Sequence, residues 1–132
     1  MGDPRILVVD DEPEVLEVMV DMLEQEGYST RSTSDSREAS QLLEETPFDV
    51  IVSDIVMPHL SGLQLLEIAR RQNPDVQVVL VTGYATNELA REALERGASG
   101  FIEKPFRIEQ LLATLRGVLW RWRLRRDPTG SA

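Results

Sequence analysis

The sequence predicts an α/β fold built on one doubly wound parallel sheet, and three observations support this prediction. The 132 residues are enough for a single well-packed domain. Short apolar runs alternate five times with amphipathic stretches, which is the pattern of strands joined by helical crossovers. The central runs are almost entirely apolar, as expected for strands that are covered by helices on both faces.

The five strands are predicted from β-branched apolar runs that end at polar or turn-forming residues. The second run is polar enough to be an edge strand. The third run ends at Asp54 and is bounded by Pro47 and Pro58. The expected strands cover about residues 5–10, 28–32, 48–54, 76–81 and 100–103.

The first two helices carry recognisable start and stop signals. Pro13 falls in the first turn of the first helix, where its missing N–H is harmless, and Gly27 is suited to end that helix. Asp35 followed by Glu38 is typical of a capping pair for the second helix. The residues expected to face the core are Val15, Met19, Met22 and Leu23 in the first helix and Ala39, Leu42 and Leu43 in the second.

The third and fourth helices are delimited in the same way. Ser61 with Gln64 is a capping box for the third helix, which stops at Asn73, before a proline. The fourth helix begins near residues 86–87 and stops at Gly97. Their expected core residues are Leu65, Leu66 and Ile68 in the third helix and Leu89, Ala90, Ala93 and Leu94 in the fourth.

The last helix is predicted from about Arg107, and its end is basic. Its arginines could interact favourably with the helix dipole and solvate the surface, or contact nucleic acid weakly. The four-three spacing of its apolar residues instead suits a partner surface, either a helical connector to an output domain or a dimer seam. We expect a main domain over residues 1–120, and a basic extension of the helix with a polar tail over 121–132. The predicted inward stripe is Ile108, Leu112, Leu115, Leu119 and Trp122, and the arginines are Arg116, Arg121, Arg123, Arg125 and Arg126.

The composition excludes several kinds of site. Lys and Arg number 14 against 23 Asp and Glu, and the net charge of −9 argues against a protein whose whole surface binds nucleic acid. With no cysteine and one histidine, the chain has no disulfide, no thiolate metal site and no His-rich metal centre. It has neither an apolar run of membrane-spanning length nor a secretory leader pattern, so we expect a cytoplasmic protein.

Side chains capable of chemistry stand at the ends of four predicted strands. Asp10 and Asp11 follow the first strand, and Asp54 closes the third. Thr82 follows the fourth strand and Lys104 the fifth. Because ligands bind at the carboxyl ends of parallel strands, and these ends share one edge of the sheet, we expect all five side chains to meet there.

Three converging carboxylates repel one another unless a cation lies between them. Mg²⁺ is favoured over Ca²⁺, because a few carboxylates, waters and a phosphate oxygen suit its octahedral coordination. Lys104 adds a fixed positive charge and Thr82 a hydroxyl donor, so the set predicts a phosphoryl pocket. Asp54 would be the nucleophile and form an aspartyl phosphate.

Each of these residues also has a purely structural interpretation. Asp10 and Asp11 could cap the helix that follows them. Asp54 and Thr82 could be ordinary turn residues, and Lys104 an ordinary surface lysine. Their joint placement at one edge of the sheet favours the functional interpretation.

In these motifs the sequence resembles the receiver domain of bacterial two-component response regulators. The resemblance covers about residues 4–120 and implies a flavodoxin-like (βα)5 fold with strand order 2-1-3-4-5. The matching segments are residues 8–13 (VVDDEP), 54–58 (DIVMP) with Gly62, 81–83 (VTG), 97–98 (GA) and 104–106 (KPF).

The resemblance implies how the phosphoryl group is acquired. Asp54 would accept it from a phosphohistidine on a histidine kinase or a phosphotransfer protein. The Lys104–Pro105 peptide bond would be cis. The expected Mg²⁺ ligands are Asp10, Asp11, Asp54 and the backbone carbonyl of Val56.

The resemblance also implies how the phosphoryl group is read. Thr82 would hydrogen-bond it and Lys104 would pair with it. Phe101 occupies the aromatic switch position and, lacking a hydroxyl, would respond only by packing. Val56 and Tyr84 flank the pocket without a carboxamide or acid that could position a water molecule, so we expect slow self-dephosphorylation.

The expected function is therefore a phosphorylation-controlled switch and not an enzyme. The added charge would pull Thr82 inward and shift the face of the fourth helix, fifth strand and fifth helix, which controls an output domain or partner. A Mg²⁺-dependent phosphohydrolase would want a second acid at Val56, and a degenerate interaction module would not need the complete acidic set. A homodimer is left open, and neither membrane nor nucleic-acid contact is expected of this domain alone.

Overall fold

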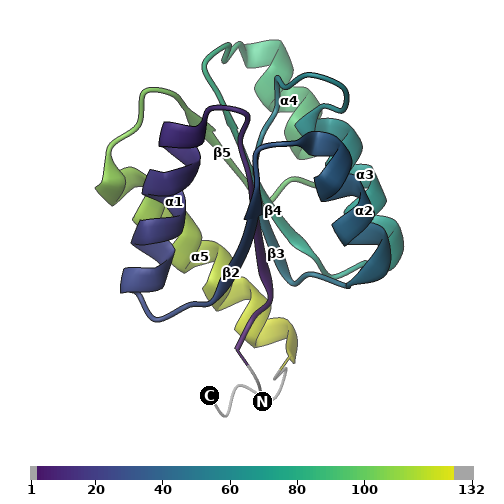
Figure 1. The fold of residues 1–132 in the computed structure, drawn as a ribbon, viewed down its shortest axis with the longest axis vertical. Helices are drawn as coiled ribbons and strands as arrows, with labels where there is room; N and C mark the ends of the chain where they lie inside the picture. The colour runs from purple at the N-terminus through teal and green to yellow at the C-terminus, as the bar shows by residue number, and fades with distance from the viewer. Residues whose placement is uncertain (1–2, 127–132) are drawn as a thin grey trace.

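The computed structural model describes residues 3–126 and contains one five-stranded parallel sheet between two layers of helices (Figure 1). The strand order is β2-β1-β3-β4-β5, so the predicted fold class is confirmed. The elements are β1 (Ile6–Val9), α1 (Pro13–Gln25), β2 (Thr30–Thr33), α2 (Ser36–Glu45), β3 (Val50–Asp54), α3 (Gly62–Gln72), β4 (Gln77–Thr82), α4 (Asn87–Glu95), β5 (Gly100–Glu103) and α5 (Ile108–Arg126).

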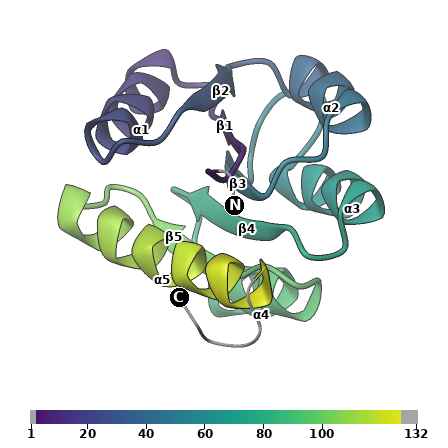
Figure 2. The same ribbon diagram turned by 90° about the horizontal axis from the view of Figure 1, so that it is seen from below.

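The two faces of the sheet bury two separate cores. Helices α1 and α5 cover one face and α2, α3 and α4 the other (Figure 2). Alternate residues of each strand point to opposite faces, so Leu7 and Ile51 pack toward α2 and α3, whereas Val8 and Val52 pack toward α1 and α5. This arrangement explains why the central strands are apolar at nearly every position.

The strand register places the polar ends at one edge. In β3, Val52 pairs with Val79, and Asp54 pairs with Val81 of β4. Thr82 is the last residue of β4 and pairs with Glu103 of β5. The predicted edge strand is β2, although it begins at Thr30 and not at residue 28.

The helix ends follow the predicted signals, except that Asp35 caps α2 by accepting from the N–H of Arg37 and not through a capping pair with Glu38. Pro13 is the first residue of α1, and Gly27 and Gly97 adopt φ values of +92° and +100° beyond the ends of α1 and α4. A positive φ is readily available to glycine and strained for other residues. Ser61 and Gln64 form the predicted capping box of α3, with the Ser61 hydroxyl accepting from Gln64 N at 3.2 Å.

Two predictions of inward-facing residues are wrong. Leu94 on α4 is 57% exposed, because α4 contacts the sheet through the side that carries Ala93. Ile108 is 50% exposed, and the buried residue of that first turn is Leu111. Helix α5 has apolar residues on two faces. Apolar residues three or four positions apart therefore form more than one possible inward stripe. The buried stripe of α5 consists of Leu111, Leu115, Val118, Leu119 and Trp122.

The basic end of α5 is bound to its own domain. Arg121 donates to the Ser99 carbonyl at 2.9 Å, and Arg125 forms an ion pair with Asp75 at 3.0 Å. Trp122 is only 4% exposed, and α5 passes residue 120 without a break. The predicted polar tail, residues 127–132, lies outside the described residues. Within residues 3–126, no helix has the length and apolar character of a membrane span.

Candidate functional site

An open pocket of about 1020 Å³ lies at the carboxyl ends of β1, β3 and β5. Its lining brings together parts of the chain that are distant in sequence. Asp11, Asp54 and Lys104 contribute charge, and Val56 and Tyr84 stand at its edge. The sheet therefore assembles the site in the way the strand ends predict.

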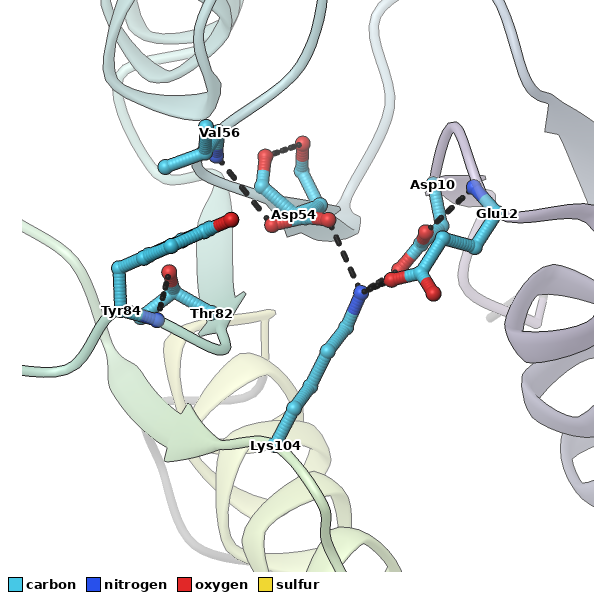
Figure 3. A network of polar contacts seen from close by, with 8 residues as sticks. Asp10, Glu12, Asp54, Val56, Thr82, Tyr84 and Lys104 are labelled. Atoms are coloured by element: carbon cyan, nitrogen blue, oxygen red, sulfur yellow. Dashed lines mark hydrogen bonds and ion pairs between the residues drawn. The ribbon is translucent and has the colours of Figure 1, made fainter.

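Asp54 is the central carboxylate of this pocket and is 5% exposed (Figure 3). Its Oδ2 atom accepts a hydrogen bond from Lys104 Nζ at 2.9 Å. Its Oδ1 atom accepts one from the backbone N–H of Val56 at 3.2 Å. Both oxygens are thus held in place, with their carboxylate turned toward the opening.

Lys104 joins the carboxylates of two strand ends. Its Nζ atom lies 2.8 Å from Oδ2 of Asp10 and 2.8 Å from Oε1 of Glu12, in addition to its bond to Asp54. The side chain of Lys104 is only 12% exposed. Lys104 is the first residue after β5, and its peptide bond to Pro105 is cis as predicted.

Asp10 is completely buried, and only one of its two carboxylate oxygens accepts a hydrogen bond from a described residue. Its Oδ1 atom accepts from the N–H of Glu12 at 2.9 Å. Its Oδ2 atom pairs with Lys104 by charge, but it has no hydrogen bond of acceptable geometry to any described residue. A buried oxygen of this kind is expected of a group that binds a further ligand.

The pKa values of the two buried acids are raised. Burial raises the pKa of Asp10 and of Asp54, and the nearby Lys104 ammonium offsets this only in part. Burial alone would lower the pKa of Lys104, but its contacts with the carboxylates of Asp10, Glu12 and Asp54 raise it overall. Lys104 therefore stays charged, and a further cation beside the carboxylates would be favourable.

The residues present fit a divalent cation. Carboxylate oxygens of Asp10, Glu12 and Asp54 lie within 4.8 Å of one another. Oxygen ligands of this type suit Mg²⁺. Asp11 lines the pocket and its charge raises the pKa of Asp54, but it is not a member of this cluster.

Glu12 is the member of the cluster that the sequence analysis did not select. It stands in the acidic run Asp10–Asp11–Glu12, which was the available signal. Its contact is with Lys104, 92 positions away, and no local pattern predicts that pairing. The exposed fraction of its side chain, 61%, leaves space for it to turn from Lys104 toward a ligand.

The predicted switch and tuning residues lie beside the central acid. Thr82 is fully buried, and its Oγ1 accepts from the N–H of Tyr84 at 3.0 Å. Val56 and Tyr84 are 49% and 72% exposed at the entrance (Figure 3). Phe101 is half-buried and packs against the core beneath α2, α3 and α4.

Comparison with known proteins identifies the family of this chain. The sequence model of the response regulator receiver domain matches residues 6–116. The nitrogen assimilation regulatory protein NtrX of Azorhizobium caulinodans is 40% identical over 124 residues, which are 92% of this chain and 27% of NtrX. The chain thus spans about a quarter of the length of that relative.

Two solved receiver domains have the same fold. The CheY-like receiver domain protein from Methanospirillum hungatei is 31% identical with a TM-score of 0.87, over 94% of this chain and 99% of that one. The beryllofluoride-activated NtrC4 receiver domain dimer is 35% identical with a TM-score of 0.83, over 89% and 98%. Sequence, strand order and overall structure together establish that the chain belongs to the response regulator receiver domain family.

Proposed function

We propose that this receiver domain is a phosphorylation-controlled switch whose acceptor is Asp54. The observation that carries the proposal is the environment of that carboxylate. It is buried at a strand end, bonded to Lys104 at 2.9 Å, and open on one side to a pocket. A nucleophile held beside a fixed positive charge suits phosphoryl transfer, which depends mainly on positioning and charge neutralisation.

The donor would be a phosphohistidine on a histidine kinase or a phosphotransfer protein. An oxygen of the Asp54 carboxylate attacks phosphorus, the P–N bond breaks, and the imidazole nitrogen keeps the electron pair and gains a proton. The product is an acyl phosphate on Asp54. Lys104 pairs with the new negative charge, and Thr82 donates a hydrogen bond from its hydroxyl to a phosphoryl oxygen. The domain thereby promotes its own phosphorylation without turning over a separate substrate.

Mg²⁺ is the proposed cofactor. When bound, it would neutralise charge on the phosphoryl oxygens. Asp10 is suited to hold it because one of its buried oxygens lacks a hydrogen bond within the described residues. The proposed ligands are Asp10, Asp11, Asp54 and the backbone carbonyl of Val56, and the position of Glu12 supports adding it, directly or through water.

The switch would be read on the face formed by α4, β5 and α5. A phosphoryl group adds about two negative charges, which draw Thr82 toward the pocket and allow Phe101 to pack inward. Helix α4 is suited to shift, because Ala93 is its only fully buried residue. The face would control an output domain or a partner, possible homodimers included, in the bacterial cytoplasm.

The proposal is tested by incubating the protein with acetyl phosphate and Mg²⁺ and measuring the intact mass. The expected result is one added phosphoryl group, labile to hydroxylamine, and no gain for Asp54→Asn. Asp49→Asn is a matched control, because Asp49 also flanks β3 but lies at its other end, where it accepts from Arg5 N at 2.8 Å. Continuous release of phosphate, or unchanged labelling of Asp54→Asn, would contradict the proposal.

A further inference from the structure

The loop between β3 and α3, residues 55–61, forms one wall of the pocket. It carries Val56 and Met57, and its base is closed by a hydrogen bond from Gly62 N to the Ile55 carbonyl at 2.9 Å. Val56 also donates its N–H to Asp54. The position of this loop therefore determines where the Val56 carbonyl lies relative to the acidic cluster.

The tip of the loop contains a strained residue. His59 has a φ of +75°, which is uncommon for a residue with a side chain. Such a conformation persists only where its surroundings hold it. His59 is exposed, and the hydrogen bonds that hold this part of the loop are made by its neighbours in the chain, Pro58 and Leu60.

Ser36 provides that restraint from another part of the fold. It is the first residue of α2 and is 2% exposed. Its hydroxyl donates to the Pro58 carbonyl at 2.6 Å and accepts from the N–H of Leu60 at 3.0 Å. One hydroxyl thus bonds to both sides of the strained residue.

The segment 33–36, which carries Ser36, also contacts the strand end that carries Asp10. Thr33, the last residue of β2, accepts a long hydrogen bond of 3.4 Å from the N–H of Asp10 through its carbonyl. Its side chain accepts from the N–H of Asp35 at 3.1 Å. Residues 33–36 therefore connect the loop that carries Val56 with the strand end that carries Asp10.

We propose that Ser36 is a positioning residue for the cation site of this domain. Its hydroxyl holds the β3–α3 loop so that the Val56 carbonyl, Asp54 and Asp10 converge before the metal binds. Ser36 itself touches neither the metal nor the phosphoryl group. The inference rests on the proposed function, since it assigns a support to the site at which Mg²⁺ would bind.

The test is Ser36→Ala in the full chain, followed by NMR with Mg²⁺ alone as the titrant. The expected Kd for Mg²⁺ rises roughly three- to tenfold, the range for losing the net effect of one or two hydrogen bonds. The Leu60 amide should exchange faster with solvent in the metal-free protein. Labelling by acetyl phosphate should still reach the wild-type extent when Mg²⁺ is saturating.

Ser99→Ala is the matched control. The Ser99 hydroxyl also makes two hydrogen bonds, donating to Gln77 at 3.0 Å and accepting from Val78 N at 3.3 Å, but it lies at the opposite end of the sheet. Its loss should leave the Kd for Mg²⁺ unchanged. A wild-type Kd in Ser36→Ala, or an equal rise in both variants, would overturn the inference.

Two further measurements separate the possible failures. If Ser36→Ala does not fold, Ser36→Cys keeps the volume with a much weaker hydrogen-bonding group and should raise the Kd in the same direction; an unchanged Kd would overturn the inference. A wild-type protein that binds no Mg²⁺ and accepts no phosphoryl group would refute the proposed function. Unchanged Leu60 exchange in the metal-free variants would instead refute the role of Ser36 alone.

Discussion

The Nζ atom of Lys104 lies 2.9 Å from Oδ2 of Asp54, although the two residues are 50 positions apart in the chain. The same ammonium lies 2.8 Å from the fully buried carboxylate of Asp10. The carboxylates at the ends of β1 and β3 are thus neutralised by the ammonium group that follows β5. Lys104 acts as an internal counter-ion in the metal-free domain.

Replacing Lys104 with Met should destabilise the metal-free protein at pH 7. The variant leaves buried carboxylates without their counter-ion, and breaking such a pair typically costs about 3–5 kcal/mol in the free energy of unfolding. Partial protonation of the acids should reduce the loss to roughly 2–3 kcal/mol. Urea unfolding with and without Mg²⁺ measures this loss of stability, and bound Mg²⁺ should reverse most of it.

Arg37→Met is the control for that experiment. Arg37 and Asp35 also form an ion pair, at 3.1 Å, but their side chains are 63% and 42% exposed. Exposed pairs contribute about 0–1 kcal/mol, and Mg²⁺ should not alter the effect. Equal losses in the two variants would show that burial does not govern the Lys104 contacts.

Asp54→Asn should stabilise the metal-free protein at neutral pH. Burial raises the pKa of Asp54 in the folded state above its ordinary value of 3.8. An acid with a raised folded pKa lowers stability when ionised, and that loss is removed as the pH falls through the folded pKa toward 3.8. The gain should therefore be largest near pH 7 and vanish in acid.

Thermal unfolding of both Asp variants and the wild type from pH 7 to pH 3.5 measures this effect. In that series the stability change of Asp35→Asn should depend on pH in the opposite direction. Hydrogen bonds from Arg37 lower the pKa of Asp35. Its ionised form therefore adds stability above pH 3.8, and this contribution is lost as the pH falls below that value. A destabilised Asp54→Asn at pH 7 would mean that its bond to Lys104 outweighs the burial of its charge.

Gly62→Ala should disturb both folding and the site. A Cβ atom at Gly62 would collide with the backbone carbonyl oxygen of Asp54 and lie 3.0 Å from the Cα of Ile55. Backbone atoms cannot rotate away from the new methyl group as a flexible side chain could, so we expect a loss of about 1–3 kcal/mol in the free energy of unfolding. Phosphoryl uptake should fall as well, because the displaced atoms carry Asp54.

Gly117→Ala is the matched control for Gly62→Ala. Gly117 lies within α5, and a Cβ atom there would meet nothing within 4 Å. Alanine is a better helix former than glycine by about 1 kcal/mol, so this variant should be more stable than the wild type. Chemical denaturation of both variants makes the comparison, and equal tolerance would contradict the crowding at Gly62.

The gathering of Asp10, Asp54, Thr82 and Lys104 was predictable because carboxyl ends of parallel strands share one edge of the sheet. Once the strands are identified, the position of each end follows from the chain order. The roles of these residues in phosphoryl transfer stay predictions. The strand order itself came from the resemblance to receiver domains and is confirmed by the structure.

Contacts made across the fold by single side chains were not predictable. Ser36 bonds to Pro58 and Leu60, 22 and 24 positions away, and nothing in its local sequence indicates a contact with that loop. The prediction of Ile108 as the first inward residue of α5 was wrong for a related reason, whereas Leu115, Leu119 and Trp122 are buried as predicted. Both Ile108 and Leu111 begin an apolar stripe at helical spacing, and only the packing against the sheet selects Leu111.

The lifetime of the phosphoryl group should be set at Val56. Val56 is 49% exposed at the pocket entrance, and its side chain has no polar atom that could hold a water molecule beside Asp54. We therefore expect slow dephosphorylation of the wild type and a roughly tenfold shorter half-life for Val56→Asn, whose carboxamide could orient the attacking water. The decay of acid-labile phosphate after removal of the donor measures both.

Leu124→Asn is the control for this variant, because Leu124 is 39% exposed on α5 and lies outside the pocket lining. It introduces the same carboxamide without placing it near the acyl phosphate, so the half-life should stay that of the wild type. Loss of phosphate from the wild-type protein within seconds would contradict the expected stability. It would also mean that another polar side chain of the pocket lining, such as Asp11, Glu12 or Tyr84, can position the water molecule in place of residue 56.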